Sequence, residues 1–400
     1  MPLSSVLGAS SVIKPGVCTS TTRPTVPYEG QLIYETDTDT LVVYSGTEWV
    51  SVNPVNRDRN VVINGAMQVA QRATSVASIT TAGYYTADRW QASITTLGTW
   101  TQSVENDAPT GSGLRKSVKM LCTTANASPA AGDSFLFRTL LEGQNIQQFA
   151  KGTASAKAFT LTFWVKASTT GTYIAELVDQ DNSRQVSAAY TVSAANTWEK
   201  KTITFPADTT GAFDNDNASS LSLNFWLGAG TNFTSGTLNT SWASTTNANR
   251  AVGQTNVAGA TNRTWQITGV QLEAGSVATP FEFEDIQTTL MRCYRYFQTS
   301  YIYGSTWPSY PTGGVQVRYN NSVDTAYIDG FSFIAPMRAA PTITLYNQVS
   351  GLVGIYRGSD AANVTGNTLP RIGTITSGLI TLGSANQNSY WFHWVASAEL

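Results

Sequence analysis

Residues 158–168 read AFTLTFWVKAS, and this stretch decides the fold class because apolar and polar side chains alternate along it. Phe159, Leu161, Phe163 and Val165 fall on one face of an extended chain. Alternation with a period of two is typical of a β-strand that buries one face. The pattern therefore predicts a strand whose apolar face lies in a core.

Similar stretches recur on both sides of this strand, separated by turns rich in Gly, Asn, Asp and Ser. Those that follow it are GTYIAELVDQDNS (171–183), TWEKKTITFPAD (197–208), SSLSLNFWLGAG (219–230) and RTWQITGVQLEAGS (263–276). Short strands with such turns favour a β-sandwich or jelly roll, which we predict for residues 61–284. Residues 228–262 are so rich in Thr, Asn, Gly and Ser that we expect a loop outside the core.

The N-terminal part has the pattern of a very small sheet. Residues 28–53 read YEGQLIYETDTDTLVVYSGTEWVSVN, in which TDTD and Ser45-Gly46 supply turns. We predict a three-stranded β-meander over 27–52, preceded by an extended arm (1–26) and followed by a polar hinge (53–60). A sheet of this size buries too little surface to be stable alone. We therefore expect residues 1–52 to be stabilised by contact with further copies of the chain or with another protein.

The C-terminal part begins with a helix. DIQTTLMRCYRYF (285–297) places apolar residues at helical spacing behind acidic residues that favour a helix start. Strand patterns return beyond it, so we predict a second β-sandwich over 298–400, whose size suits one domain. The whole chain is thus expected to be all-β apart from one boundary helix.

Composition excludes several functional classes. Charged residues make up only 12% of the 400 residues, and the net charge is −2, so no basic footprint for nucleic acid is present. No run approaches the ~20 apolar residues of a membrane span. The N-terminus has no basic segment followed by a long apolar one, which predicts synthesis in a cytoplasm without a secretion signal. The widely spaced Cys18, Cys122 and Cys293 form neither a disulfide framework nor a metal motif.

Catalytic groups are scarce. His393 is the only histidine, and its strand, YWFHWV, is aromatic on both faces, which favours a buried or interface position. Asp179 and Asp181 in DQDNS could pair for glycan cleavage, and DQDNS and DNDN (214–217) could bind calcium, but ordinary turns explain both stretches. A second set of acids near the boundary helix fits a polar linker and a helix N-terminus: Glu273, Glu282, Glu284 and Asp285. We predict no catalytic residue, no metal site and no cofactor.

Aromatic residues are the feature of this sequence that most directly indicates a binding site. The segment YIYGSTWPSYP (301–311) carries Tyr301, Tyr303, Trp307 and Tyr310. Sugar C–H faces stack on such rings, while Asn, Asp, Ser and Thr bind hydroxyls, so these four residues are the predicted glycan-binding candidates. A buried core or a subunit interface is the alternative use of the same residues.

Four blocks of this sequence resemble bacteriophage tail-fibre proteins. The meander is similar to a short β-motif near their N-termini, and NVVINGAMQVAQR with YYTADRW resembles the opening of a phage fibre module. The matching positions are Asn60, Asn64, Gly65, Gln71, Arg72, Tyr85, Asp88, Arg89 and Trp90. GVQLEAGSVATPFEFEDIQTTLMRCYRYF is similar to the end of that module, and PMRAAPTITL with SYWFHWVASAEL is similar to fibre endings. The matching positions in the module end are Gln271, Leu272, Glu273, Gly275, Ala278, Thr279, Pro280, Phe281, Glu282, Cys293, Tyr294 and Tyr296. The strand pattern of 159–276 is also similar to carbohydrate-binding jelly rolls.

The resemblance implies a structural virion protein that forms homotrimers. It would attach to the phage baseplate or tail hub through its N-terminal part and contact host polysaccharide or lipopolysaccharide through a distal domain, with residues 298–400 as the receptor-binding tip. Two alternatives stay open: a tail-associated depolymerase that cleaves glycan, and a connector without a ligand.

Overall fold

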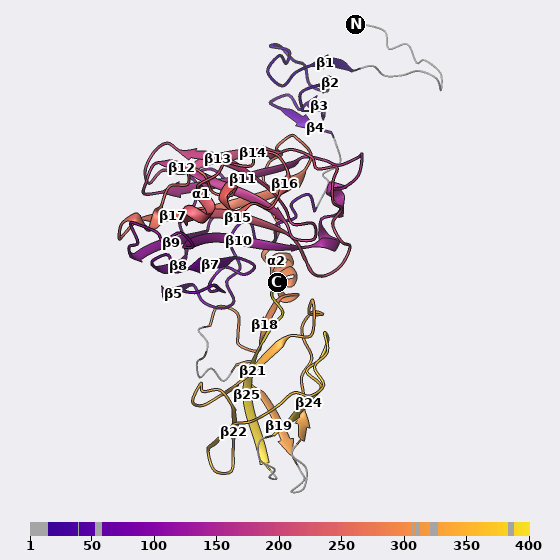
Figure 1. Cartoon of the computed structure of the whole chain (residues 1–400). Helices are drawn as coiled ribbons and strands as arrows, with labels where there is room; N and C mark the ends of the chain where they lie inside the picture. The colour runs from indigo at the N-terminus through magenta and orange to yellow at the C-terminus, as the bar shows by residue number, and fades with distance from the viewer. Residues whose placement is uncertain are drawn as a thin grey trace. The chain divides into compact units, whose positions relative to one another are not determined.

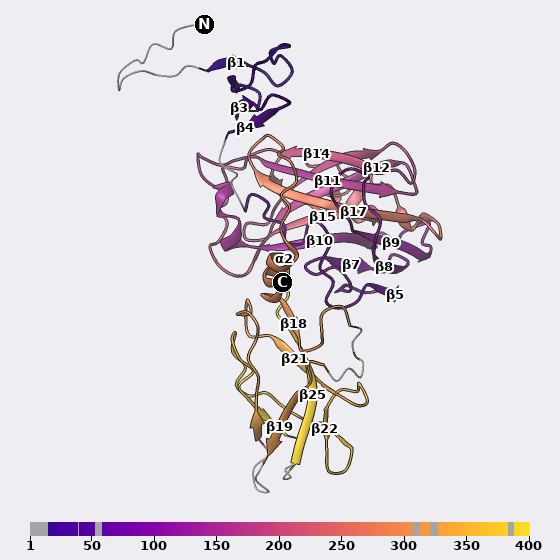
Figure 2. The ribbon, with the colours of Figure 1, turned by 180° about the vertical axis from the view of Figure 1, so that it is seen from behind.

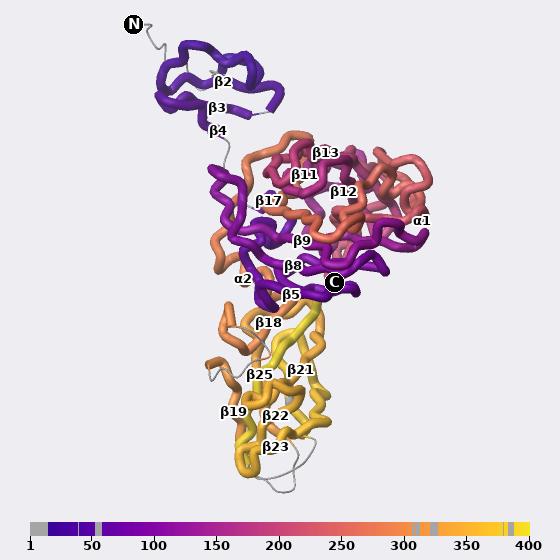
Figure 3. Tube along the Cα trace, turned by 90° about the vertical axis from the view of Figure 1, so that its left-hand side faces the viewer, coloured from indigo at the N-terminus to yellow at the C-terminus, as the bar shows by residue number. Residues whose placement is uncertain are grey.

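The computed structural model describes residues 15–38, 40–52, 58–305, 308, 313–320, 327–382 and 388–400. The chain divides into a first unit, residues 1–59, and a second unit, residues 60–400. Figures 1 and 2 show the ribbon from opposite sides, and Figure 3 shows the trace from a third direction. The fold is all-β with little helix, as the sequence predicts.

The first unit is a small sheet with the strand order β1-β2-β3-β4. The strands are β1 (Gly16–Cys18), β2 (Leu32–Glu35), β3 (Thr40–Tyr44) and β4 (Trp49–Ser51). Strands β2, β3 and β4 form the predicted antiparallel meander. Strand β1 pairs with β2 in parallel, so residues 16–18, which we expected in an extended arm, belong to the sheet.

The faces of this sheet differ in chemistry. Ile33 and Val42 are buried on one face, beside the ion pair of Arg23 and Glu35. The other face is apolar and partly open to solvent across all four strands. Cross-strand pairing brings together on it Val17, Leu32, Tyr34, Leu41, Val43 and Val50. We call these residues the apolar face of the first unit.

The second unit begins with two sheets that pack face to face. The first, here the β15 sheet, has the order β16 (Ala243–Ser244), β13 (Arg184–Val192), β12 (Gly171–Asp179), β15 (Ser219–Ala229), β10 (Ser134–Glu142), β7 (Gln91–Thr95), β6 (Gly83–Tyr84). The second, here the β17 sheet, has the order β14 (Glu199–Phe205), β11 (Phe159–Ala167), β17 (Thr264–Ala274), β9 (Ser117–Thr124), β8 (Thr99–Glu105), β5 (Ser75–Ile79). The chain crosses repeatedly between the sheets, as in a jelly roll.

The core between these sheets follows the predicted alternation. Phe163 of β11 meets Phe225 of β15 edge to face, with ring centroids 5.0 Å apart. The predicted inward residues are buried in the same cluster: Phe159, Leu161, Phe163, Val165, Tyr173, Ala175, Leu177, Ile203, Phe205, Leu221, Leu223, Phe225 and Leu227.

Residues 228–262 differ from the expected polar loop. They contain α1 (Thr231–Thr234), strand β16 and the 3₁₀ turns η3 (Asn247–Asn249) and η4 (Val257–Gly259). Val257 and Ala258 lie in the main core, and Ala251 packs beside Trp226 on the outside of the β15 sheet. The prediction was wrong because sparse apolar residues in a polar stretch can still cover a sheet. Two further 3₁₀ turns, η1 (Gly143–Asn145) and η2 (Gln147–Phe149), follow β10.

The boundary helix α2 runs over Ile286–Tyr294, shorter than the predicted 285–297. Asp285 caps its start by accepting hydrogen bonds from the backbone N–H groups of Gln287 and Thr288. The chain then enters strand β18 (Phe297–Thr299), which pairs with the C-terminal strand β25 (Asn388–Ser397). Sheet pairing thus ends the helix early.

Strand β25 organises the rest of the second unit. It pairs with β18 and β19 (Gln316–Asn320) on one edge, and with β21 (Thr342–Asn347) and β22 (Ile355–Arg357) on the other; β22 also pairs with β23 (Ala362–Val364). Figure 3 shows β25 among these neighbours. A short ribbon of β20 (Tyr327–Asp329) and β24 (Leu379–Thr381) covers one face. The predicted C-terminal β-sandwich is thus one sheet and a small ribbon around a shared core.

Candidate functional site

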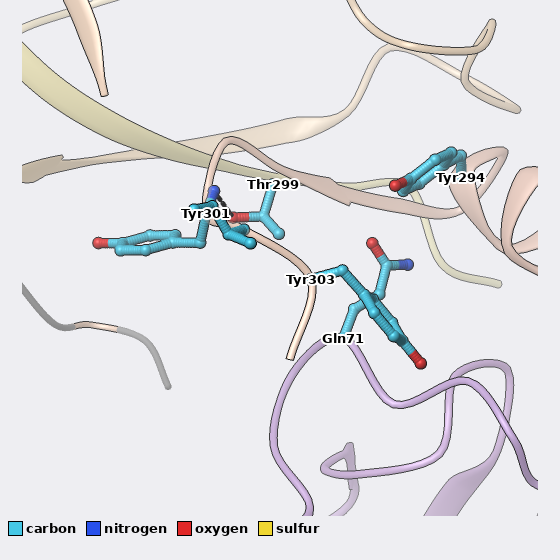
Figure 4. Close-up of a pocket in the computed structure, with 6 residues that line it drawn as sticks. Gln71, Tyr294, Thr299, Tyr301 and Tyr303 are labelled. Carbon is cyan, nitrogen blue, oxygen red and sulfur yellow. Dashed lines mark hydrogen bonds between the residues drawn. The ribbon is translucent and has the colours of Figure 1, made fainter. Parts of the chain in front are cut away.

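The predicted aromatic candidates do not form one platform. Tyr301 is buried, and its ring stacks on His393 with centroids 4.0 Å apart. Tyr303 is 45% exposed, and its hydroxyl donates to the carbonyl of Gln68 at 3.3 Å. Figure 4 shows their rings pointing away from each other. Trp307 and Tyr310 lie outside the described residues.

Tyr301 and Tyr303 line a small pocket instead. Gln71 from the loop before β5, Tyr294 from α2, and Thr299 and Ile302 from the chain around β18 complete its wall. The Gln71 amide donates to Asp88 and to the carbonyl of Phe297, so the pocket wall belongs to a fixed network. The pocket is too small and too tightly held to receive a sugar ring as it stands.

A better aromatic surface lies on the outer face of the β25 sheet. Cross-strand pairing aligns Val317 of β19, Trp391 of β25 and Tyr356 of β22 in one row. Trp391 and Tyr356 meet edge to face, with ring centroids 6.2 Å apart. Tyr319, two residues along β19 from Val317, is 70% exposed. We call Tyr319, Tyr356 and Trp391 the C-terminal aromatic face.

The strand pattern explains why these rings are available. Tyr390, Phe392 and Trp394 point into the core beneath the sheet, so Trp391 and His393 must point to the opposite face. His393 is covered by Tyr301, whereas Trp391 remains 37% exposed. The sequence analysis missed Trp391 as a site residue because the aromatic run YWFHWV suggested burial on both faces.

His393 is held as a structural residue. It is fully buried, and its Nδ1 lies 3.0 Å from the Ser300 hydroxyl. The prediction of a buried histidine is confirmed.

The acidic candidates are engaged in structural contacts. The ammonium of Lys151, fully buried, lies 2.5 Å from Asp179 and 3.1 Å from Asp208. It holds the place that a cation would take beside the predicted DQDNS turn. Asp181 accepts a hydrogen bond from the backbone of Asp214 at 2.9 Å, which joins this turn to the DNDN stretch.

The acids near the boundary helix are likewise paired. Glu273 accepts from the backbone and hydroxyl of Thr279, and Glu282 accepts from the backbone of Asn60. Glu284 pairs with Arg292 at 3.0 Å, and Asp285 caps α2. Within the described residues, no group of three or more His, Cys, Asp and Glu side chains could hold a metal ion.

The motif residues that carry the tail-fibre resemblance meet in one buried network. Asn64 donates to the carbonyls of Val69 and Asp88, and the Trp90 indole donates to the carbonyl of Asn64. Gly65 approaches β17 so closely that an added Cβ would lie 2.1 Å from the carbonyl oxygen of Val270. These contacts fix the segment before β5 to the sandwich.

The same network reaches the C-terminal residues. Arg72 and Arg89 both pair with Glu399, and Arg72 also lies 3.5 Å from Asp88. Full burial raises the pKa of Asp88, although Arg72 and Gln71 oppose that rise. The guanidinium of Arg89 packs 3.5 Å from the ring centroid of Tyr296. The motif therefore serves packing between the sandwich and the α2–β25 region.

The thiols of Cys122 and Cys293 are buried and that of Cys18 is half-buried, and all three are free. None of the described helices has the length and apolarity that crossing a bilayer requires.

No protein-family model matches this chain, and no curated protein matches its sequence. Several solved structures align with about half of it. TmCBM61 in complex with β-1,4-galactotriose aligns at 11% identity over 54% of this chain and 99% of that chain, with a TM-score of 0.28. The family 11 carbohydrate-binding module from Clostridium thermocellum aligns at 11% identity over 51% and 98%, with a TM-score of 0.27. The N-terminal cellulose-binding domain of Cellulomonas fimi β-1,4-glucanase C aligns at 13% identity over 48% and 90%, with a TM-score of 0.24. At these TM-scores the alignments identify neither a family nor a ligand.

Proposed function

We propose that this chain is a structural protein of a bacteriophage tail fibre that binds a glycan of the host cell surface through the C-terminal aromatic face. The observation that carries the binding function is the row of Trp391 and Tyr356, with the exposed Tyr319 beside it. Partly exposed rings on a rigid sheet offer flat apolar surfaces on which sugar C–H groups can stack. Each contact is weak, and several copies on one fibre would add their affinities.

The tail-fibre assignment is supported by the sequence resemblance of the four blocks. Two residues of its central block, Arg72 and Arg89, both pair with Glu399. Asn64 donates to the carbonyl of Asp88, and both of these residues belong to the same block. A motif whose members pack together is better support than scattered identities. The proposed location is the virion tail, after synthesis in the host cytoplasm.

Homotrimer formation is proposed for the apolar face of the first unit. Val17 is 62% exposed, and Leu32 and Val50 are 39% and 43% exposed. A solvated apolar face on so small a sheet favours association, because association removes that surface from water. The remaining first-unit surface would then contact baseplate or tail-hub proteins.

We propose that the protein is not an enzyme. The single histidine is buried, and the acids that could have formed a cleavage pair are engaged by Lys151, Thr279, Asn60 and Arg292. Glycan cleavage needs a pair of free carboxyl groups about 5–10 Å apart. Binding without cleavage fits these contacts better than the depolymerase alternative.

The test is binding of host-surface polysaccharide by the full chain and by Trp391→Ala. We expect the wild type to bind and Trp391→Ala to bind at least tenfold more weakly, because the central ring of the row is lost. Phe283→Ala, which removes an exposed ring outside this sheet, is the matched control and should bind as the wild type does. New reducing ends in the incubated polysaccharide would favour the depolymerase, and no binding by any variant would favour the connector.

A further inference from the structure

The outer face of the β15 sheet carries a row of polar side chains that runs across five strands. Direct cross-strand pairing aligns Tyr84 of β6, Gln91 of β7, Arg138 of β10, Asn224 of β15 and Glu176 of β12. Trp90, Phe137 and Phe225, which adjoin members of this row in the sequence, lie in the core, so the row faces outward. Strands β7, β10, β15 and β12 are labelled in Figure 1. The row thus brings one cation, Arg138, and one acid, Glu176, to the same face.

Glu176 is not the counter-ion of Arg138. Its fully buried carboxylate accepts two hydrogen bonds from the guanidinium of Arg250, at 2.7 and 2.9 Å. The amide of Asn224, which lies between Glu176 and Arg138 in the row, donates to the same carboxylate at 3.0 Å. Glu176 is also two strands away from Arg138, and adjacent strands lie about 4.7–4.9 Å apart. The charge of this acid is therefore satisfied by Arg250, and Asn224 separates it from Arg138.

The guanidinium of Arg138 is held at its inner nitrogen and open at its outer edge. Its Nε atom donates to Oε1 of Gln91 at 2.6 Å, which fixes the orientation of the group. Its two terminal nitrogens have no acceptor among the described residues, and neither is a buried atom, so both reach solvent. The amide nitrogen of Gln91, half-buried like Arg138, is open in the same way. Adjacent side chains thus present three unused donor nitrogens to solvent.

The electrostatic surroundings of Arg138 favour an incoming anion. Burial lowers the pKa of Arg138, and although Tyr84 and Glu176 oppose that change, the pKa stays lowered. On the same face, by contrast, Glu176 outweighs the effect of burial on Arg250 and leaves the pKa of Arg250 raised. The difference is a counter-charge, which Arg250 has and Arg138 lacks within the described part of the chain. Because the planar guanidinium matches two oxygens of a carboxylate or a phosphate, such a group would supply that counter-charge.

We propose that Arg138 and Gln91 form a binding site for an anionic group, a carboxylate or a phosphate, of a cell-surface glycan. The terminal nitrogens of Arg138 donate to two oxygens of this group, and the amide nitrogen of Gln91 donates to the same group or to a neighbouring hydroxyl. The site lies on the sandwich and is separate from the C-terminal aromatic face. The inference rests on the proposed function in one respect only, namely that the ligand is a glycan, and it adds that this glycan is acidic.

The experiment is affinity electrophoresis of the full chain in gels that contain polygalacturonic acid, poly(glycerol phosphate) or neutral dextran. We expect retardation by at least one of the two anionic polymers, and which of them retards the protein shows whether the ligand group is a carboxylate or a phosphate. Arg138→Gln should weaken this retardation at least tenfold. Lys200→Gln is the matched control, because it removes one positive charge from the exposed surface of β14, in the other sheet, and should leave retardation unchanged. Trp391→Ala should also leave it unchanged, so a failure of the C-terminal aromatic face and a failure of this site are distinguishable.

Gln91→Glu supplies the sharpest outcome. It places a carboxylate where the amide oxygen now accepts from Nε of Arg138, so the counter-charge comes from the chain itself. We expect this variant to unfold at an equal or higher urea concentration than the wild type while its retardation by the anionic polymer falls at least tenfold. A purely structural role of Arg138 would not produce these opposite effects, and the charge change equals that of Lys200→Gln. No retardation of the wild type by either anionic polymer, or equal retardation of the wild type, Arg138→Gln and Gln91→Glu, overturns the proposal.

Discussion

Arg89 and Glu399 form a buried ion pair although 310 residues separate them in the chain. Arg89 is fully buried, and Glu399 also pairs with Arg72. Burial alone would lower the pKa of Arg89. The Coulombic attraction of the nearby Glu399 opposes this effect and leaves the pKa of Arg89 raised. The pair thus connects the start of the sandwich to the end of β25.

Loss of this ion pair should destabilise the second unit strongly. Glu399→Gln leaves the guanidinium of Arg89 buried without its counter-charge, which typically costs about 3–5 kcal/mol of unfolding free energy. Urea denaturation followed by tryptophan fluorescence measures the change. Asp360→Asn removes the partner of Arg357 at the surface and should cost far less. Equal losses of unfolding free energy in the two variants would mean that the Arg89–Glu399 pair stabilises the second unit no more than a surface ion pair does.

Glu142 predicts a defined pH dependence. Burial raises its pKa, but hydrogen bonds, above all from Arg295, outweigh burial and leave the pKa below the ordinary 4.5. A lowered pKa means that the ionised form is preferred in the folded state, so this stabilisation is present above pH 4.5 and is lost as the pH falls through the lowered value. The stability difference between wild type and Glu142→Gln should therefore be constant from neutral pH down to about pH 5 and shrink in more acidic urea titrations. A stability difference between the two proteins that grows in acid would contradict the lowered pKa of Glu142.

Gly65→Ala should destabilise the sandwich. The added Cβ would lie 2.1 Å from the carbonyl oxygen of Val270, so the segment or β17 must shift, at a cost of about 1–3 kcal/mol. Gly132→Ala is the matched control, since its nearest neighbour beyond the adjoining residues is 3.9 Å from the added carbon. Thermal denaturation of both variants shows whether the close approach to Val270 is the reason why residue 65 is a glycine.

Calcium should not stabilise the protein. Lys151 and Arg184 together already neutralise Asp179 and Asp208, so neither added calcium nor a chelator should change the melting temperature. Lys151→Met should lower stability by about 3–5 kcal/mol, because it leaves the buried carboxylate of Asp179 without its counter-charge, while Asp208 keeps Arg184. A melting temperature that rises with calcium in the wild type would contradict this arrangement.

Self-association should depend on the apolar face of the first unit. We expect the wild type to sediment as a trimer at micromolar concentration, and Val43→Lys to shift the distribution toward smaller species, because a buried ammonium is costly. Thr47→Lys, in the exposed turn between β3 and β4, adds the same charge outside that face and should leave sedimentation unchanged. A monomeric wild type would remove the basis for the trimer.

Strict local alternation made most of the sandwich predictable from the sequence. Phe159 to Val165 and Leu221 to Leu227 point inward as their period requires. The end of α2 was not predictable in this way, because Phe297 has helical spacing but lies in β18 and pairs with Ser397 of β25. Long-range pairing overrode the local pattern.

The candidate site was harder to predict for the same reason. Tyr301 was chosen for its aromatic surroundings, yet a distant residue, His393, covers it. Trp391 could be recognised as outward-facing only when the core side of β25 was known.

Strand β25 has a consequence for biosynthesis. It follows in the chain every strand with which it pairs, so β18, β19, β21 and β22 leave the ribosome before their common partner exists. Until residues 388–397 emerge, these segments have unpaired backbone edges, which bind chaperones and proteases readily. Nascent chains interrupted before β25 should therefore be degraded, so the second unit becomes stable only when this last strand has been made.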